Sequence, residues 1–149
     1  MKNMIIGFGL LLSNVACDSA KINQQTEQKV NQFEVLYVEE YGGSGVEETR
    51  IIDNQGDFSL FWAEVTSQPA LSAKKFDSNE KMIIVKNFES RNSGGNTYEI
   101  KSVTQKGDQI QVTYSVTSPT EFGTMAITSP MMILLVDKVE KPTIEFIIE

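Results

Sequence analysis

The chain has 149 residues, with 13 lysines and arginines against 20 aspartates and glutamates, and a formal net charge of −7. This acidic balance argues against binding to nucleic acid or to an anionic lipid surface by charge. Histidine is absent and cysteine occurs once, which removes the usual general base, the Ser/His and Cys/His nucleophile pairs, the commonest zinc ligand and any internal disulfide. We therefore expect no catalytic site, no metal and no cofactor, and a fold held by its core.

The first 16 residues have the pattern of an export signal. Lys2 gives a positive start, residues 4–12 are apolar, and Ala16 is a small residue at the expected cleavage point. The apolar run is too short to remain as a transmembrane helix. The stretch Val15-Ala16-Cys17 resembles the lipobox of bacterial lipoproteins, with Asn14 where leucine is usual. In that pathway the cysteine thiol receives a diacylglycerol and the chain is cut before it.

Cys17 is therefore the predicted lipidation site. The alternative is an ordinary cleaved signal with a leftover thiol, but an unpaired thiol in an exported protein calls for an explanation. Two or three acyl chains would anchor the protein stably. We expect a bacterial cell-envelope protein that the lipid holds to a membrane, with the leaflet, periplasmic or surface-exposed, left open. Removing residues 1–16 leaves 133 residues with a charge of −8.

After Cys17 the chain is polar up to residue 32 and has no apolar stripe long enough to pack. Residues 17–32 are therefore predicted to be a flexible tether. Residues 33–149 have a suitable length for one domain.

The domain begins with β-type segments. Phe33, Val35 and Tyr37 alternate with other residues, residues 42–45 (Gly-Gly-Ser-Gly) break the run, and residues 46–52 suggest a second strand. This order predicts a hairpin whose turn is the glycine-rich segment, which lacks the lysine of a phosphate-binding loop.

One helix is predicted over residues 55–65. Asp53-Asn54 offers a cap, and apolar residues then recur at spacings of three and four. Trp62 is expected in the core, where it would hold this helix against a sheet.

The remaining chain favours strands. Residues 82–85 are all apolar, typical of a buried central strand, and residues 97–104 and 109–117 flank a turn at 105–108. Residues 110–116 alternate strictly between apolar and polar, which predicts one core face and one water face. Two more strands are expected at 131–136 and 144–148. We predict a mainly β fold (α+β at the margin), a two-layer antiparallel β-sandwich of about seven strands with one packed helix.

Several of these pieces together resemble the PrcB C-terminal domain family. They are Leu60-Phe61-Trp62 on the helix, Phe76 before Met82-Ile83-Ile84-Val85, Gly94-Gly95 followed by alternating residues, Pro119 in a loop, and Thr128-Ser129-Pro130 before an apolar strand. Asn96 and Met131 stand where that family usually has tyrosine. The family is named for a lipoprotein subunit that stabilises a secreted protease complex. The resemblance implies a non-catalytic cell-envelope domain with an accessory role toward a protease.

Two loops are candidate partner contacts, because loops on a rigid β scaffold often carry recognition. The first contains Arg91, Asn92, Gly94, Gly95 and Asn96, and the second contains Pro119 and Phe122. For Gly94-Gly95 the sequence favours a tight turn over a partner contact, whereas Phe122 can equally pack on the core or contact a partner. Whether the two loops meet at one end of the domain decides between these readings.

Acidic residues also cluster around the first predicted hairpin: Glu39, Glu40, Glu47 and Glu48. Paired carboxylates can serve glycoside hydrolysis or calcium binding. No calcium-loop motif accompanies them, so we interpret these glutamates as solvated surface residues.

The sequence supports two functions. The first is a lipid-tethered, non-catalytic envelope domain that binds or stabilises another protein, such as a protease complex. The alternative is a protease inhibitor that presents the two loops to an active-site cleft, a hypothesis that rests on analogy between folds. The identity of the partner and the oligomeric state are not predicted.

Overall fold

A computed structural model describes residues 29–66, 74–119, 123 and 125–149 of the chain. The export signal, Cys17 and most of the predicted tether lie outside the described residues. The described part forms eight strands, one of them only two residues long, and one α-helix. In chain order these are β1 (Lys29–Val30), β2 (Phe33–Glu39), β3 (Glu48–Ile52), α1 (Gln55–Thr66), β4 (Lys81–Asn87), β5 (Thr97–Lys106), β6 (Gln109–Thr117), β7 (Met131–Asp137) and β8 (Thr143–Ile148).

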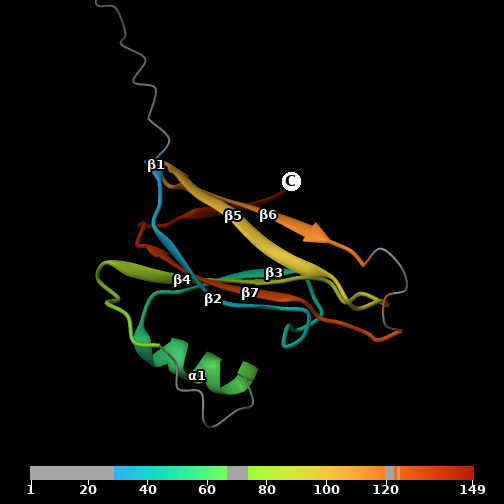
Figure 1. The fold of residues 1–149 in the computed structure, drawn as a ribbon. Coiled ribbons are helices and arrows are strands. Elements are labelled where there is room, and N and C mark those ends of the chain that lie inside the picture. The colour runs from blue at the N-terminus through green and yellow to red at the C-terminus, as the bar shows by residue number, and fades with distance from the viewer. Residues whose placement is uncertain (1–28, 67–73, 120–122, 124) are drawn as a thin grey trace, which may run out of the picture.

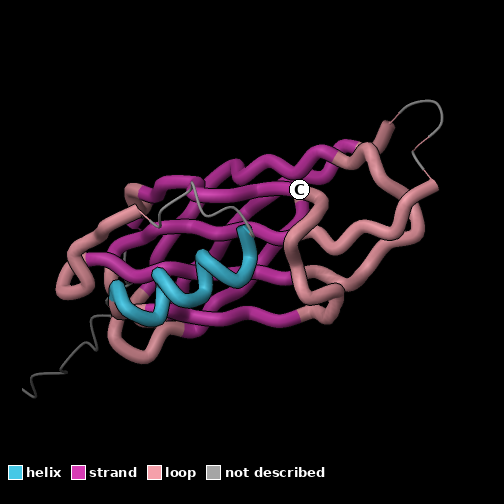
Figure 2. Tube along the Cα trace, turned by 90° about the horizontal axis from the view of Figure 1, so that it is seen from below, coloured by secondary structure: helices cyan, strands magenta, loops and turns pink. Residues whose placement is uncertain are grey.

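The strands form two four-stranded sheets that pack face to face, and α1 covers the outer face of one of them (Figure 1). One sheet has the order β1-β5-β6-β8 and the other the order β2-β7-β4-β3. Seen from below, α1 lies over a sheet and runs at a slant along the direction of its strands (Figure 2). The predicted mainly β sandwich with one packed helix is therefore confirmed.

The apolar strand at residues 82–85 is central, as its composition predicts. All its residues are buried, because β4 lies between β7 and β3 and both of its faces are covered. Ile83 and Val85 pack with Phe58 and Phe61 of the helix. Met82 and Ile84 face the other sheet, where they meet Val112 and its neighbours. Trp62 is partly buried at the edge of the helix layer, 5.5 Å from the ring of Phe58.

The helix begins where the sequence predicts. Asn54 caps it, since its Oδ1 accepts a hydrogen bond from the Asp57 N–H at 2.8 Å and its Nδ2 donates to the Asp57 carboxylate at 2.7 Å. Such a cap satisfies N–H groups that the first turn leaves without partners. The Gln55 side chain then accepts a hydrogen bond from the Phe76 N–H at 3.0 Å, which ties the helix start to the chain entering β4.

The predicted hairpin of β2 and β3 is wrong. These strands lie at opposite edges of their sheet, with β7 and β4 between them. The glycine-rich segment crosses the end of the sheet instead of turning back. It is held there by hydrogen bonds from the Gly43 N–H to the Ser129 carbonyl (2.9 Å) and from the Ser90 N–H to the Gly45 carbonyl (3.0 Å).

Two further expectations are corrected. The sandwich is not entirely antiparallel, because β8 pairs with β6 in the parallel direction. The last residues of the predicted tether also belong to the fold. Strand β1 pairs with the end of β5, and Asn31 is buried, with its N–H bonded to the Val103 carbonyl at 3.0 Å and its Nδ2 bonded to Gln105 at 3.1 Å.

Candidate partner-binding site

Three loops that are distant in the sequence meet at one end of the sandwich, which we call the loop end (Figure 1). They are residues 40–47 after β2, residues 88–96 after β4, and the described part of residues 118–130 before β7. Arg91 and Thr128 exchange two backbone hydrogen bonds of 2.9 Å, and the Thr128 hydroxyl donates to the Ser93 carbonyl at 3.3 Å. The two loops predicted as partner contacts thus converge.

Glu40 braces the second of these loops. Its carboxylate accepts hydrogen bonds from the backbone N–H of Gly95, at 2.8 Å, and from that of Asn96. Charge-assisted bonds of this kind are stronger than neutral ones. Gly95 has a φ of +92°, and a Cβ there would lie 3.3 Å from Pro119. The Gly94-Gly95 segment is therefore a constrained turn whose shape depends on a distant carboxylate.

The predicted contact residues separate into two groups. Arg91, Asn92, Gly95 and Pro119 are exposed on the loop end, whereas Gly94 and Asn96 are buried. Asn96 accepts a hydrogen bond from the Ser118 hydroxyl at 2.9 Å and donates to the Ser93 carbonyl at 3.3 Å, so it joins the two loops beneath the surface. Phe122 lies outside the described residues.

A cluster of aromatic rings packs between the strands next to the loop end. Phe88 lies 5.5 Å from both Tyr98 and Tyr114, and Tyr114 lies 6.3 Å from Phe146. Burial raises the pKa of both Tyr98 and Tyr114 above the usual value of 10.0. The Tyr98 hydroxyl is buried and has no hydrogen-bond partner among the described residues.

A buried cation stands at the edge of this aromatic cluster. The Lys86 ammonium lies 5.6 Å from the Phe88 ring centre and 5.4 Å from that of Phe146, and it bonds to the Glu47 carboxylate at 2.7 Å. The Lys86 side chain is only 8% exposed, whereas that of Glu47 is 62% exposed. The hydrogen bond and charge of Lys86 hold the pKa of Glu47 below its usual 4.5. The loop after β2 is thereby attached to β4.

The acidic residues of the predicted first hairpin do not form a joint site. Glu40 braces a turn, Glu47 pairs with Lys86, and Glu39 and Glu48 lie exposed on two different edge strands. Within the part of the chain that the structure describes, no group of three His, Cys, Asp or Glu side chains is placed to hold a metal ion.

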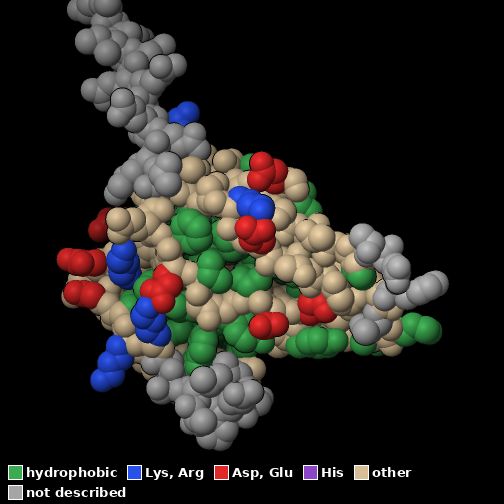
Figure 3. Space-filling view, viewed as in Figure 1, with side chains coloured by type: hydrophobic (Ala, Val, Ile, Leu, Met, Phe, Trp, Pro, Cys, Tyr) green, Lys and Arg blue, Asp and Glu red, His purple; other side chains and the backbone are tan. Residues whose placement is uncertain are grey.

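Exposed apolar side chains lie at the surface of the loop end. Met125 is fully exposed and Ile127 is 73% exposed, and hydrophobic side chains reach the surface at this tip (Figure 3). The loop end also has a shallow hollow of about 280 Å³, lined by Glu47, Phe88, Glu89, Ser90, Arg91 and Tyr114. The sequence reasoning missed Met125 and Ile127, because two isolated apolar residues in a loop resemble ordinary core contacts.

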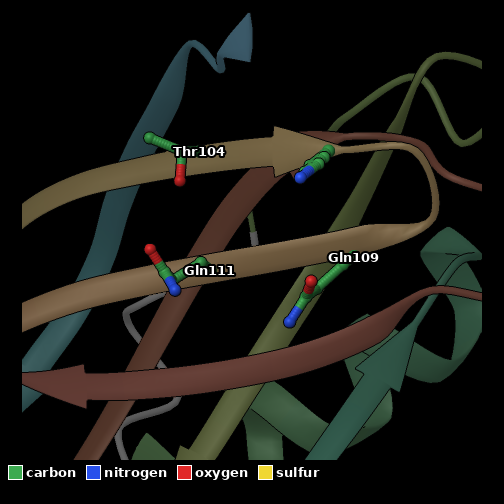
Figure 4. A pocket seen from close by; sticks show the side chains of 4 residues that line it. Thr104, Gln109 and Gln111 are labelled. Carbon is green, nitrogen blue, oxygen red and sulfur yellow. The ribbon is translucent and has the colours of Figure 1, made fainter. Parts of the chain in front are cut away.

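A second hollow lies on the outer face of the β1-β5-β6-β8 sheet, near the opposite end of the molecule. Thr104, Gln109 and Gln111 line it together with Lys106, and they belong to β5 and β6 (Figure 4). The Nε2 atoms of Gln109 and Gln111 both donate to the Glu145 carboxylate, at 3.0 and 3.3 Å. These bonds engage the glutamines within the sheet surface, so this hollow is the weaker candidate for a site.

No helix among the described residues is long and apolar enough to cross a membrane.

The comparison with known families matches residues 82–137 to the PrcB C-terminal family. The match runs from β4 to β7 and includes the loops that hold Arg91, Asn96 and Pro119. This match confirms the resemblance, but over a shorter stretch than the motifs quoted from the sequence, because α1 and β8 lie outside the matched residues. No curated protein and no solved structure matches the chain.

Proposed function

We propose that this protein is a non-catalytic, lipid-anchored domain of the bacterial cell envelope that binds another protein through its loop end and stabilises it. The observation that carries the proposal is the convergence of three loops into one cross-braced surface. The hydrogen bonds of Glu40, Asn96 and Thr128 hold the described parts of these loops together without a partner. A preformed surface binds with less loss of conformational entropy than a mobile one.

The placement of β1 supports this function. β1 pairs with the last residues of β5, Gln105 and Thr104, whereas the loop end lies at the first residues of the same strand. A strand of this length spans about 33 Å. A lipid at Cys17 would therefore join the domain at the end away from the loops, which leaves the loop end free to meet a partner in the envelope.

The chemistry of the surface favours a protein as the partner. Exposed apolar side chains such as Met125 and Ile127 are typical centres of protein contacts, which a polar rim surrounds. The glutamates of this end (Glu39, Glu40, Glu47, Glu48 and Glu89) outnumber its two cations, Lys86 and Arg91. This end would repel an anionic bilayer and would attract a partner with a basic rim.

The family match supports a protease complex as that partner. The PrcB C-terminal family takes its name from a subunit associated with a protease complex, and the match includes both partner-contact loops. The role we propose is to hold such a complex at the membrane without taking part in its chemistry.

Co-purification from detergent-solubilised membranes tests the proposal. A specific envelope protein should accompany the lipidated wild-type chain and the Leu60→Glu control, whose change lies on the exposed face of α1. The double variant Met125→Glu, Ile127→Glu should remain folded and membrane-bound but lose that protein. Equal recovery of the partner with all three chains, or no specific partner for the wild type, would contradict the proposal.

Inhibition of a protease is the second candidate, favoured by the same convergence of the two loops. Its test is direct. The lipidated chain in detergent should inhibit at least one serine, cysteine or metalloprotease at micromolar concentration, and Pro119→Glu should abolish the inhibition. A broad panel that stays fully active would remove this candidate and leave the binding role unaffected.

A further inference from the structure

The two sheets have four outer edges, and three of them carry features that prevent pairing with another strand. β2 has a bulge between Val35 and Tyr37. β5 is covered at one end by β1 and has a bulge between Ile100 and Ser102. Natural sheets use bulges, charges and short strands to protect their edges in this way.

Charged side chains add to this protection. Next to the β5 bulge, Lys101 pairs with Glu99 at 2.6 Å. The third edge, β3, is only five residues long and places the exposed side chains of Glu48 and Arg50 along it.

The outer edge of β8 differs from these three. β8 stands at the end of its sheet, and its pairing with β6 is regular over all six residues. The Thr143 N–H bonds to the Asp108 carbonyl and the Glu149 N–H to the Tyr114 carbonyl, each at 2.9 Å. In a parallel pair, alternate residues bond to the neighbouring strand. The backbone groups of residues 144, 146 and 148 therefore point outward along the edge.

The side chains of β8 offer no protection. Its sequence Thr-Ile-Glu-Phe-Ile-Ile contains no proline, glycine or lysine, and its single charge, Glu145, is engaged by two glutamines. Ile147 is 36% exposed and Ile148 is 60% exposed. A regular, apolar edge whose backbone groups have no strand partner among the described residues is a template for a further strand.

We infer that the β8 edge receives an extended segment of a partner protein as an added strand. The segment would exchange backbone hydrogen bonds with residues 144, 146 and 148, place apolar side chains beside Ile148 on one face, and place a basic side chain near Glu145 on the other face. This inference rests on the proposed function, because both require that the chain binds another protein. It adds a second contact surface, the β8 edge, and states that the partner binds there as a strand.

A second copy of this chain fits the edge less well. β8 runs from the β1 end of the molecule toward the loop end (Figure 1). Two β8 strands paired antiparallel would point the two lipid anchors in opposite directions, which does not suit two chains held by one membrane. Each lipidated chain, without residues 1–16, also carries a net charge of −8, so the two copies repel each other.

The test uses the lipidated chain in detergent micelles and a fluorescein-labelled peptide of eight residues in which valine and lysine alternate. The control peptide has the same composition with the four lysines in one block, so it keeps the charge but not the alternation. We expect the alternating peptide to bind and to slow hydrogen exchange within residues 143–149. The block peptide should bind roughly tenfold more weakly, because it cannot align its apolar side chains on one face.

Two variants of the exposed residue Ile148 distinguish the contribution of backbone hydrogen bonds to peptide binding from that of apolar side-chain contact. Ile148→Pro removes an outward N–H and blocks the edge, whereas Ile148→Ala keeps the N–H and removes most of the side chain. Peptide affinity should fall roughly tenfold for the proline variant relative to the alanine variant, as expected for lost backbone hydrogen bonds. If the proline variant does not fold, the hydrogen-exchange result on the wild type decides the question.

Equal affinities for the two variants, protection at another edge, or no binding of the alternating peptide at millimolar concentration would overturn the inference. A stable dimer with β8 amides already protected would overturn it as well, since the occupant would then be a second copy. The proposed function is judged separately, by whether Met125→Glu, Ile127→Glu loses the envelope partner.

Discussion

The two ends of this sandwich are built differently. At the end near β1, β5 and β6 are joined by a turn at Gly107-Asp108, and the space around Gly107 is open. At the loop end, the described parts of three long segments are joined by hydrogen bonds of Glu40 and of the buried Asn96 and Thr128. Lysine and acidic side chains lie together at the first end, and apolar side chains emerge at the second (Figure 3).

Such a difference indicates where recognition takes place. A short turn is sufficient to connect two strands, so connection alone does not require long loops with buried polar groups. Loops that are long and also fixed by hydrogen bonds are suited to binding a partner.

The largest effect is expected at Cys17. Replacing Cys17 with serine removes the thiol that would carry the lipid, so essentially all of the protein should leave the membrane fraction for the soluble fraction. Asn14→Leu, which restores the usual lipobox residue, should stay in the membrane. Fractionation with metabolic labelling by a fatty acid checks this. A Cys17→Ser protein that remains in the membrane would show that no lipid at Cys17 anchors the chain.

Alanine substitutions at two glycines, one at each end, compare how tightly the two ends are packed. A Cβ on Gly43 would lie 2.7 Å from the Pro130 carbonyl oxygen, so Gly43→Ala should lower the free energy of unfolding by about 3 kcal/mol. Gly107 has a φ of +61° in open space, so Gly107→Ala should lower it by only about 1 kcal/mol. Chemical denaturation measures both values. Equal losses would mean that the loop end is no more tightly packed than the turn.

Glu40→Gln tests the brace of the Gly94-Gly95 turn. The neutral amide keeps an acceptor but loses the charge assistance of two backbone bonds, so we expect a loss of about 1–2 kcal/mol in unfolding free energy. The loop of residues 88–96 should also exchange its amide hydrogens faster. Glu39→Gln, on an exposed neighbour, should change the stability by less than about 0.5 kcal/mol. Identical behaviour of the two variants would rule out Glu40 as the brace.

The smallest effect concerns the ion pair of Glu47 with Lys86. Because the pKa of Glu47 is lower in the folded chain than its usual 4.5, its contribution to stability is present above pH 4.5 and is lost as the pH falls below that value. Glu47→Gln should therefore lose stability less steeply on acidification than the wild type. Thermal unfolding from pH 7 to pH 3 gives the comparison, with Glu48→Gln as the control. Parallel wild-type and Glu47→Gln curves would contradict this assignment.

Local patterns in the sequence predicted most of the elements but not how they pair. The strict alternation in residues 110–116 and the spacing of Phe58 and Phe61 report which faces are buried, and burial follows from each segment alone. The pairing of β2 with β7, rather than with β3, depends on contacts across the whole chain. The same reason explains why the parallel direction of β8 was not predicted.

The candidate site was predicted only in outline. Glycine and proline marked the loops at Gly94-Gly95 and Pro119 because these residues set backbone angles locally. The role of Glu40 in holding a turn 55 residues later carries no local signal. The exposure of Met125 and Ile127 likewise depends on where the loop lies in the fold.

Site-specific photo-crosslinking in intact cells shows which end of the sandwich contacts a partner. A photoreactive amino acid at Met125 on the loop end is compared with one at Asp108, an exposed residue at the opposite end. If the loop end is the recognition surface, Met125 should give one dominant crosslinked protein and Asp108 should give none of it. The same product from both positions, or a product from Asp108 alone, would show that the loop end is not the recognition surface.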